Sequence, residues 1–505
     1  MSITKSSSGK PIYLLILLIT FAAAYAYTFD SKVAMLGDNA YYYTLGKAIA
    51  QGDGYVNISR VNKSPNNHYP PGYPALISIA LFLGGSIFIV KLMNGLLLLG
   101  SIYIIYELTA HLLQSEKLAF VIALLVTLNS HILYYSSIMM SEVPFLFFSG
   151  LSLLLFIKAD KNYLSIKNYF MIGALLAMIV AYYIRSLGVA LLAGYLLFFI
   201  LERKWKPTLI YFGGLVIGVL PWFIRGQKLG GGSYLKQLTL INPYQPNLGQ
   251  ADFGDFVDRF FTNFERYITW EIPSVLFPIK QPQYGSEPTT GEWFVGLIVL
   301  ALMFYGIFQV GKYKWLFMGY LLATFGILMI WPSVWIGVRF IVPMVPILLI
   351  GLFNALYIFI SKVSLASGKK SFNPLLLLIF IFFSISPVNA LNEQAKASYS
   401  PAWKNYFSMA KWVNRNLDDG VVVSCGKPAL FYLEAETFTM RYKFAQNPAE
   451  LIKDLEEKQV DYVVVDQVYG NTFRYLVPAI RQYPNRFEQV LHLQNPDTYL
   501  LKFKR

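Results

Sequence analysis

The chain is poor in cysteine, in histidine and in charge. Of its 505 residues, 14% are charged and 56% are hydrophobic, and it holds one cysteine and four histidines. The single cysteine, Cys425, excludes an intramolecular disulfide and a cysteine-based metal cluster. The histidines, at 68, 111, 131 and 492, lack the spacing of a zinc protease. Soluble domains have about a quarter of their residues charged, so most of this surface faces something other than water.

Long apolar runs indicate that much of this surface faces a lipid bilayer. A helix that crosses a bilayer needs about 20 mainly apolar residues, and we count about eleven such runs. They lie at roughly 12–29, 86–112, 117–133, 143–157, 168–184, 187–201, 207–224, 292–310, 315–331, 340–361 and 373–390. The sequence therefore predicts a polytopic α-helical membrane protein whose first run is a retained helix. Segment 74–85 is too short to span and is expected to form a half-buried helix before the next span.

The basic residues indicate the topology. Fourteen of them, against three acidic residues, fall at alternate ends of the predicted spans, which marks those ends as cytoplasmic. These are Lys5, Lys10, Lys117, Lys158, Lys161, Lys167, Arg203, Lys204, Lys206, Lys312, Lys314, Lys362, Lys369 and Lys370. The net charge of +14 thus reflects topology, and nucleic acid is not an expected partner. The first outer loop, about 30–73, and everything after 391 are then expected outside the cytoplasm.

The composition becomes that of a soluble domain after residue 391. We predict a transmembrane domain over 1–390 and an extracytoplasmic α/β domain over 391–505. Helical and strand-like stretches alternate there, at 403–416, 420–425, 447–458 and 461–466. This alternation is typical of βαβ units and predicts a small, largely parallel sheet. No glycine-rich phosphate loop follows either strand-like run, so no nucleotide site is predicted.

Asp38 is the first candidate for chemistry. It follows the first predicted helix by a few residues, so its carboxylate is expected near the membrane surface. A partly desolvated carboxylate can act as a general base, because burial raises its pKa toward the working pH. Asp38 is also well placed to be the N-cap of a helix that starts at Asn39 or Ala40. The spacing alone leaves both interpretations open.

Glu142 is the second candidate acid. It begins the fourth predicted helix at the end that is expected outside the cytoplasm. An acid at this position gains from the helix dipole, which is a purely structural reason for its presence. The functional alternative is a second carboxylate that faces Asp38 across a cleft.

Two arginines lie where the positive-inside rule disfavours them. Arg185 and Arg339 are at the outer ends of predicted helices. A guanidinium there either binds an anion such as a phosphate, whose oxygens match its fork, or reaches toward lipid head groups. Arg60 and Lys63, in the first outer loop, are weaker candidates for phosphate binding.

Taken in order against the helix pattern, these residues resemble the GT-C superfamily of membrane glycosyltransferases. The resemblance is to bacterial relatives of the dolichyl-phosphate-mannose protein mannosyltransferases, which include the aminoarabinose transferase of lipid A. It covers residues 1–350. The matching residues are Gly37-Asp38 with Tyr42, Tyr69 to Pro74, Ser141-Glu142, Pro221-Trp222, and Arg339 to Pro346.

The resemblance implies an inverting glycosyltransferase at a bacterial inner membrane. It would transfer a sugar from a polyprenyl-phosphate-linked donor to a protein, lipid A or a surface glycan on the outer face. Asp38 corresponds to the catalytic acid of the family's first loop and would be the general base. The implied donor-phosphate residues are Arg339, Arg185, Lys63 and Arg60, and the implied substrate-lining residues are Tyr42, His68, Tyr69 and Tyr73.

One departure from the family's pattern concerns the acids. Many members carry an Asp-Glu pair where this chain has Asp38-Asn39, so one carboxylate is missing from that place. We therefore expect Glu142 to supply the second acid. No cofactor and no metal ligand are predicted, with a divalent metal ion as the open alternative.

Two other classes of function compete with this one. A transporter or flippase of lipid-linked sugars would explain the spans and the arginines within them. Such proteins often consist of two similar halves with broken helices, which this sequence does not show. A polysaccharide polymerase or ligase that uses diphosphate-linked glycans usually depends on a long, late outer loop. Large outer loops with a first-loop aspartate favour the sugar transferase.

Overall fold

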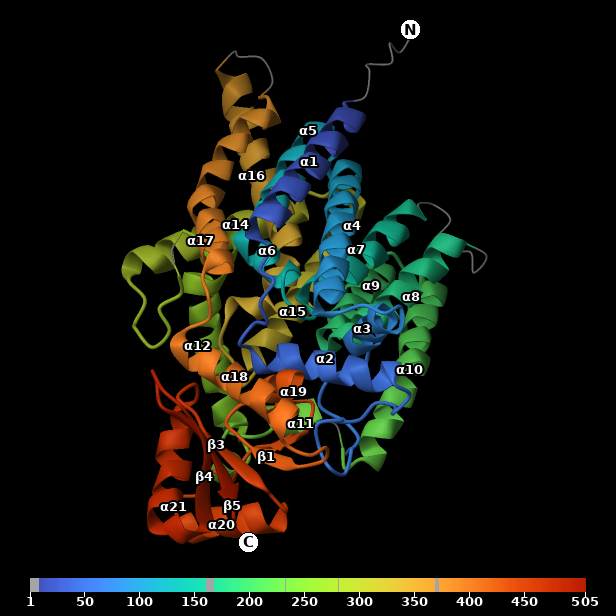
Figure 1. The fold of residues 1–505 in the computed structure, drawn as a ribbon. Helices are drawn as coiled ribbons and strands as arrows, with labels where there is room; N and C mark the ends of the chain where they lie inside the picture. Colours follow the sequence, from blue (N-terminus) through green and yellow to red (C-terminus); the bar gives the residue numbers. More distant parts are fainter. Residues whose placement is uncertain (1–8, 160–167, 232, 280, 368–371) are drawn as a thin grey trace. The chain divides into compact units, whose positions relative to one another are not determined.

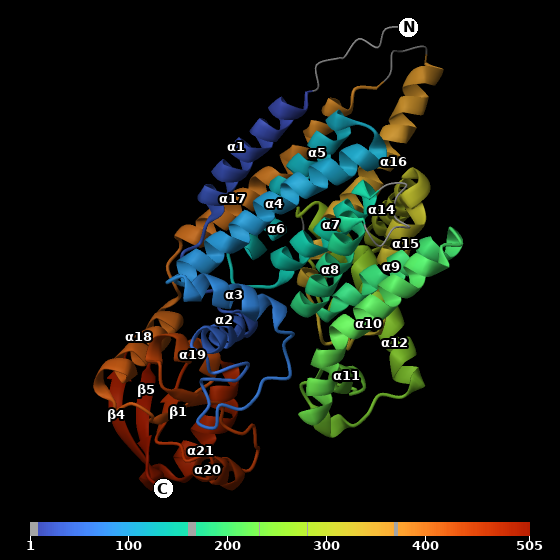
Figure 2. The ribbon, with the colours of Figure 1, turned by 90° about the vertical axis from the view of Figure 1, so that its right-hand side faces the viewer.

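A computed structural model describes residues 9–159, 168–231, 233–279, 281–367 and 372–505 (Figures 1 and 2). The chain forms two compact units. The first comprises Met1–Ser31, Asn67–Tyr73 and Phe88–Ala395, and the second comprises Lys32–Asn66, Pro74–Ile87 and Lys396–Arg505. The expected cytoplasmic residues Lys5, Lys161, Lys167, Lys369 and Lys370 lie outside the described residues.

The first unit is built from helices. Those that follow one another up to residue 238 are α1 (Lys10–Thr28), α4 (Ile87–Leu113), α5 (Glu116–Thr127), α6 (Ser130–Ser136), α7 (Glu142–Lys158), α8 (Tyr169–Ile184), α9 (Val189–Leu201), α10 (Trp205–Lys228) and α11 (Ser233–Leu238). The later ones are α12 (Phe253–Arg266), α13 (Ile272–Leu276), α14 (Thr290–Phe308), α15 (Lys314–Ile330), α16 (Val345–Ala366) and α17 (Phe382–Lys396). Each predicted apolar run overlaps one of these helices or a pair of them, and the run 373–390 begins with a 3-10 helix, Pro374–Ile381, before α17.

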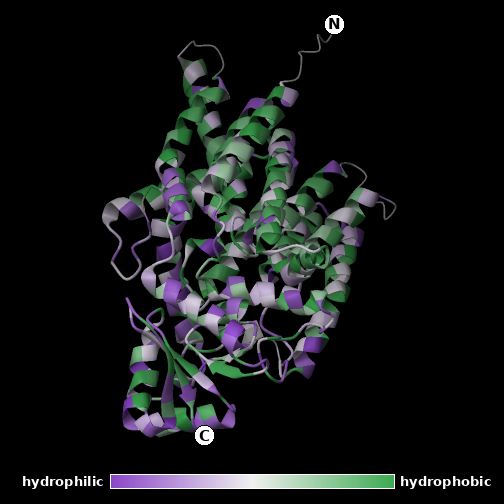
Figure 3. Ribbon diagram, viewed as in Figure 1, coloured by the Kyte–Doolittle hydropathy of each residue, from purple (hydrophilic) through white to green (hydrophobic). Residues whose placement is uncertain are grey.

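Seven of the described helices are long and apolar enough to cross a membrane, or eight if the bent pair α5 and α6 is one span. Figure 3 shows most helices of this unit coloured as hydrophobic over most of their length. The predicted fold class, a multi-pass helical membrane protein, is thereby confirmed. The count of about eleven spans stays a prediction.

The predicted span 117–133 is broken into two helices. The axis bends by 59° between α5 and α6. The cause is Asn129, whose side chain accepts a hydrogen bond from the backbone N–H of Ile132 and thereby caps α6. Its amide also donates to the carbonyl of Val275, at 2.7 Å. A polar side chain that satisfies backbone groups in this way ends one helix and starts another.

The second unit contains a mixed five-stranded sheet. Its strands are β1 (Val422–Ser424), β2 (Phe438–Met440), β3 (Tyr462–Val465), β4 (Phe487–Leu493) and β5 (Thr498–Phe503), in the order β2-β1-β3-β5-β4. The pairs β1–β2 and β1–β3 are parallel, as predicted, whereas β3–β5 and β4–β5 are antiparallel. The prediction of a largely parallel sheet is therefore wrong for the last two strands. They form a hairpin whose first strand mixes polar and apolar residues, has no continuous apolar run and has no fully buried position.

Helices cover both faces of this sheet. They are α18 (Pro401–Asn416), α19 (Pro428–Ala435), α20 (Pro448–Glu457) and α21 (Val477–Gln482). Successive strand residues point to opposite faces. Val422 and Val463 accordingly pack in the cluster with α20 and α21, while Val423 and Val464 pack in the cluster with α18 and α19.

Most of the first loop, residues 32–66, is part of the same unit. It contains α2 (Gly37–Ala50), and the segment that follows it contains α3 (Gly72–Phe82), the short non-spanning helix that the sequence predicts. Ala40 of α2 packs against Phe407, Ala429 and Leu430 of the C-terminal helices. The loop residues 32–66 thus share a core with the C-terminal residues, and the predicted division into 1–390 and 391–505 stays a prediction.

Candidate active site

Asp38 lies in the first turn of α2, in the second unit. The helix begins at Gly37, and its N-cap is Leu36, which makes no side-chain cap. The N-cap interpretation of Asp38 is therefore wrong, although an acid in the first turn still complements the positive end of a helix. Its neighbour Asn39 is fully buried and donates from Nδ2 to the carbonyl of Ala34, at 3.1 Å. Asn39 therefore fastens the turn before the helix.

The other predicted residues of the first loop differ in their surroundings. Tyr42 is buried on α2. Lys63 is half exposed, and its Nζ lies 2.7 Å from Oδ1 of Asp53, so a neighbouring carboxylate balances its charge. Arg60 is exposed and donates to the hydroxyl of Ser64 at 3.3 Å. The two predicted phosphate ligands of this loop are therefore not equivalent, since only Arg60 is left without a balancing carboxylate among the described residues.

Glu142 and Arg185 form an ion pair in the first unit. Glu142 is the first residue of α7 and is fully buried, and its Oε1 lies 2.6 Å from Nη1 of Arg185. Arg185 ends α8 and also donates to the hydroxyl of Ser141. No described residue hydrogen-bonds to the other oxygen of Glu142, Oε2. Two predicted site residues that are 43 positions apart are thus neighbours.

Arg339 belongs to the same neighbourhood. It lies in a short 3-10 helix, Val338–Phe340, and its guanidinium stands 4.9 Å from the centroid of the Phe340 ring. The charges of Arg339, Arg185 and Glu142 all act on the hydroxyl of Tyr135, which is on α6. The structure therefore brings these three predicted residues around one tyrosine.

Sequence reasoning missed a buried lysine. Lys91, on α4, is fully buried and donates from Nζ to the carbonyl of Asp30, at 2.7 Å. The charges of Asp30 and Glu142 both act on the hydroxyl of Tyr134, which is on α6. The sequence did contain a signal for Lys91, because it is a single cation inside the predicted span 86–112. A charged residue within a span is a functional candidate by default.

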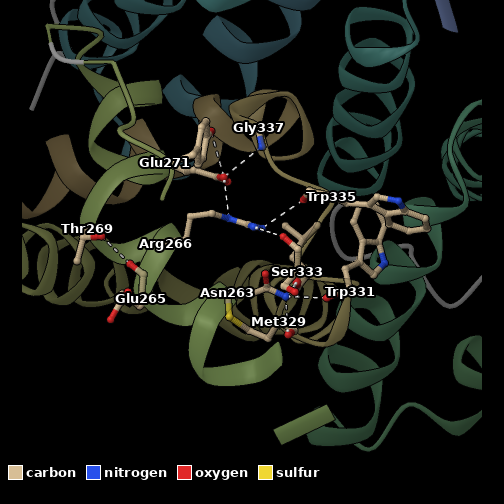
Figure 4. A network of polar contacts seen from close by, with 12 residues as sticks. Asn263, Glu265, Arg266, Thr269, Glu271, Met329, Trp331, Ser333, Trp335 and Gly337 are labelled. Carbon is tan, nitrogen blue, oxygen red and sulfur yellow. Dashed lines mark hydrogen bonds and ion pairs between the residues drawn. The ribbon is translucent and has the colours of Figure 1, made fainter. Parts of the chain in front are cut away.

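Sequence reasoning also missed an ion pair, which holds the segment that carries Arg339 (Figure 4). Arg266 ends α12, and its Nε lies 3.0 Å from Oε1 of Glu271. It donates to the carbonyl of Ser333 at 3.0 Å and to that of Trp335 at 3.3 Å. Glu271 in turn accepts from the backbone N–H of Gly337, at 3.3 Å. Burial raises the pKa of the Glu271 carboxyl, and Arg266 opposes this shift.

Asn263, one turn before Arg266, holds the beginning of the same segment. Its Nδ2 donates to the carbonyls of Met329 and Trp331, at 2.9 and 2.8 Å. Figure 4 shows these side chains pointing from α12 toward the backbone that follows α15. The segment 331–340 is thus tied to α12 at several points, and α12 positions Arg339 indirectly.

The predicted substrate-lining residues His68, Tyr69 and Tyr73 lie in the first unit. The His68 ring stacks on Tyr234, with centroids 5.3 Å apart, and meets the edge of Tyr69 at 4.5 Å. Tyr73 is fully buried, and its hydroxyl accepts from Nδ2 of Asn94, at 2.9 Å. Tyr73 therefore packs within the protein, while His68 is half-buried in an aromatic stack.

The residues described offer no obvious metal centre. Among them, no group of three or more histidine, cysteine, aspartate or glutamate side chains is arranged to hold a metal ion. What the first unit does offer is a concentration of charge, with the cations Lys91, Arg185 and Arg339 near the acids Asp30 and Glu142. Such a cluster suits binding of an anion.

Comparisons with known proteins agree with this geometry. Residues 68–224 match the family described as dolichyl-phosphate-mannose-protein mannosyltransferase. No curated protein sequence matches the chain. At 11% identity, the chain is similar to the crystal structure of ArnT from Cupriavidus metallidurans bound to undecaprenyl phosphate, with a TM-score of 0.61 and 98% of each chain covered. At 12% identity it is similar to the oligosaccharyltransferase of Archaeoglobus fulgidus tethered with an acceptor peptide, with a TM-score of 0.59 and coverage of 98% of this chain and 74% of that one.

At such low identities the structural likeness shows the fold. The matched family segment contains Glu142, Arg185 and the aromatic residues from His68 onward. The segment and the fold agree with the resemblance that the sequence motifs indicate. The chain is thus a multi-pass helical membrane protein with the fold of these two structures, and its residues 68–224 match the mannosyltransferase family.

Proposed function

We propose that the protein is an inverting transferase that moves a sugar from a polyprenyl-phosphate-linked donor to an acceptor on the outer face of a bacterial inner membrane. Two comparisons support the donor class. The family that matches residues 68–224 is named for dolichyl-phosphate-mannose, and the similar ArnT was crystallised with undecaprenyl phosphate. Both are phosphates of long isoprenoid alcohols, whose tails stay in the bilayer.

The observation that carries the proposal is the charge cluster of the first unit. The cations Lys91, Arg185 and Arg339 lie in the same part of this unit as the carboxylates of Asp30 and Glu142. A departing polyprenyl phosphate is an anion, which guanidinium and ammonium groups attract. Cationic groups that are fixed before the reaction stabilise such a leaving group without reorganisation.

Among these cations we assign the leaving group to Arg339 first. Arg185 already pairs with Glu142 at 2.6 Å, so its charge is largely balanced. Arg339 lies on the segment 331–340, whose backbone carbonyls accept hydrogen bonds from Arg266 and Asn263. These bonds support a fixed position for Arg339. Arg266 is in this view a positioning residue, because its own guanidinium is occupied by Glu271 and the segment.

Asp38 is proposed as the general base on the strength of the family resemblance. It would take a proton from the hydroxyl or amine of the acceptor, whose oxygen or nitrogen then forms a bond to the anomeric carbon. The bond from that carbon to the phosphate oxygen breaks, and the polyprenyl phosphate leaves with the electron pair. A single displacement inverts the anomeric centre, and the phosphate needs no proton at neutral pH.

The test is release of polyprenyl phosphate from a labelled polyprenyl-phosphate-sugar pool, with source membranes as the acceptor. Wild type is compared with Asp38→Asn and Arg339→Gln. The matched control is Asp53→Asn, which removes an acid of the same loop that pairs with Lys63. A positioned general base contributes about 10²–10⁴-fold in rate, so Asp38→Asn should reduce release by at least about 100-fold while Asp53→Asn stays near wild type.

The competing classes give different results in the same assay. Normal release by Asp38→Asn would refute the assignment of the base. Release of a diphosphate carrier from diphosphate-linked glycans, with none from the monophosphate pool, would identify a polymerase or ligase. Movement of the labelled lipid across the membrane without release would identify a transporter.

A further inference from the structure

The second unit contains a cavity that the proposed chemistry does not use. Its volume is about 570 Å³, within the range of about 300–1,000 Å³ that is usual for small-molecule sites. One wall comes from the first loop, including Tyr41 and Arg60. The other comes from the C-terminal residues, including Thr439, Arg441 and Lys458. The cavity therefore exists only because the loop and the C-terminal residues pack together.

The two walls are joined by direct contacts. The backbone N–H of Thr439 donates to the carbonyl of Ser59 at 2.8 Å, which attaches the loop to β2, an edge strand of the sheet. Lys47 of α2 forms an ion pair with Glu436, at 2.7 Å. Ala40 packs into the core that α18 and α19 form. These contacts fix the width of the cavity.

The cavity has an excess of positive charge. Arg60, Arg441 and Lys458 line it, against the single carboxylate of Glu457. Lys458 is balanced by Asp454 at 2.7 Å. Neither Arg60 nor Arg441 forms an ion pair with a carboxylate among the described residues. Two guanidinium groups are thus available to an anion.

Arg441 is held in place without being neutralised. Its guanidinium lies 5.7 Å from the centroids of the Phe444 and Tyr469 rings, and such contacts restrain an arginine while keeping its charge. Lys458 donates from Nζ to the carbonyl of Arg441, at 3.0 Å, which fixes the backbone there. A restrained guanidinium loses little freedom when it binds a phosphate or carboxylate through two parallel hydrogen bonds.

We propose that this cavity binds an anionic saccharide, meaning a sugar that carries a phosphate or a carboxylate, as part of the acceptor. Arg60 and Arg441 would bind the anionic group. The side chains of Asn62 and Gln459 offer amides for sugar hydroxyls, and Met440 and Tyr41 provide an apolar surface for the ring. The acceptor role rests on the proposed transferase activity, whereas the binding itself does not.

The experiment measures binding to the full-length protein in detergent by isothermal titration calorimetry. The probes are glucose 1-phosphate, glucuronic acid, glucose and inorganic phosphate. Hydrogen bonds to charged groups are the strong ones, so each anionic sugar should bind at least about tenfold more tightly than glucose. Arg60→Gln and Arg441→Gln should each weaken that binding by at least about tenfold.

The control is Lys443→Gln, two residues beyond Arg441. Lys443 is also exposed, but it pairs with Glu450 and does not line the cavity. Its variant should bind the anionic sugars as wild type does, and all variants should unfold at the same temperature as wild type. A defect of equal size in Lys443→Gln, or none in the two arginine variants, would overturn the proposed site.

Two further outcomes are decisive. Inorganic phosphate that binds as tightly as glucose 1-phosphate would show an anion site only and would refute the saccharide part. If only the proposed function is wrong, polyprenyl phosphate is not released but the anionic sugars still bind. Conversely, normal release with no sugar binding would refute this inference and leave the transferase assignment intact.

Discussion

Oε1 of Glu142 lies 2.6 Å from Nη1 of Arg185, and the carboxylate is fully buried while the arginine is nearly so. Glu142 is the first residue of α7 and Arg185 follows the last residue of α8, so the pair joins the ends of two packed helices. A buried charge is tolerated only when a partner balances it. The pair is therefore both a structural link and the source of two of the three charges that act on Tyr135.

The first prediction concerns this pair. Glu142→Ala and Arg185→Ala should each lower the free energy of unfolding by about 3–5 kcal/mol, because each leaves an uncompensated buried charge. The double variant should be destabilised by clearly less than the sum of the two. Denaturant unfolding in mixed micelles, arranged as a double-mutant cycle, measures the coupling. Strictly additive losses would mean that the two groups do not stabilise one another.

A second prediction concerns the segment 331–340. Arg266→Met removes the hydrogen bonds to Ser333 and Trp335, so amide hydrogen exchange in this segment should become faster. Transfer should fall with it, because Arg339 lies on this segment. The matched control is Arg259→Met, which removes a buried arginine that instead donates to the carbonyl of Leu238. That variant should speed exchange near 238–241 and leave 331–340 protected.

The third prediction tests the glycine of the Pro-Pro-Gly turn. A Cβ added at Gly72 would lie 2.6 Å from the backbone carbonyl of Tyr183, which cannot easily shift because α8 ends there. Gly72→Ala should therefore lower the unfolding temperature and the yield of folded protein. At Gly326, in α15, an added Cβ meets nothing within 4 Å, so Gly326→Ala should behave like wild type. Equal behaviour of the two variants would contradict the close approach.

The fourth prediction concerns pH. Burial raises the pKa of Asp466, which follows β3, from 3.8 to about 6, although three backbone N–H groups bind its carboxylate. Between these two values the folded state holds more protons than the unfolded state, so stability falls as pH rises through this window and then levels off. The shift corresponds to at most about 3 kcal/mol.

Asp466→Asn removes this titration. The unfolding temperature of the full chain should fall between pH 4 and pH 6.5 by more in wild type than in Asp466→Asn. Other carboxylates titrate in both proteins, so the difference between the two curves isolates Asp466. Superimposable curves would show that the Asp466 carboxyl does not take up a proton in this range.

The sequence alone was sufficient for the membrane helices and for much of the C-terminal unit. Apolar runs of the right length predict spans because an unpaired backbone group is costly in a bilayer, so such runs must be helical. The short apolar runs in 420–425 and 461–466 predict β1 and β3 for a similarly local reason. The strand β4 has no such local signal, because polar residues interrupt its apolar ones, and its place beside β5 depends on pairing between strands.

The candidate site divides in the same way. The sequence nominated Glu142, Arg185 and Arg339 one by one, from the cost of placing charge at the ends of membrane helices. Only the tertiary structure decides that Glu142 pairs with Arg185 and that both lie near Arg339, since side chains so far apart along the chain meet through helix packing. It also decides that α12 holds the segment of Arg339 and that Arg60 shares a cavity with Arg441. Hydropathy and charge are properties of single segments, whereas a binding site is a property of which segments become neighbours.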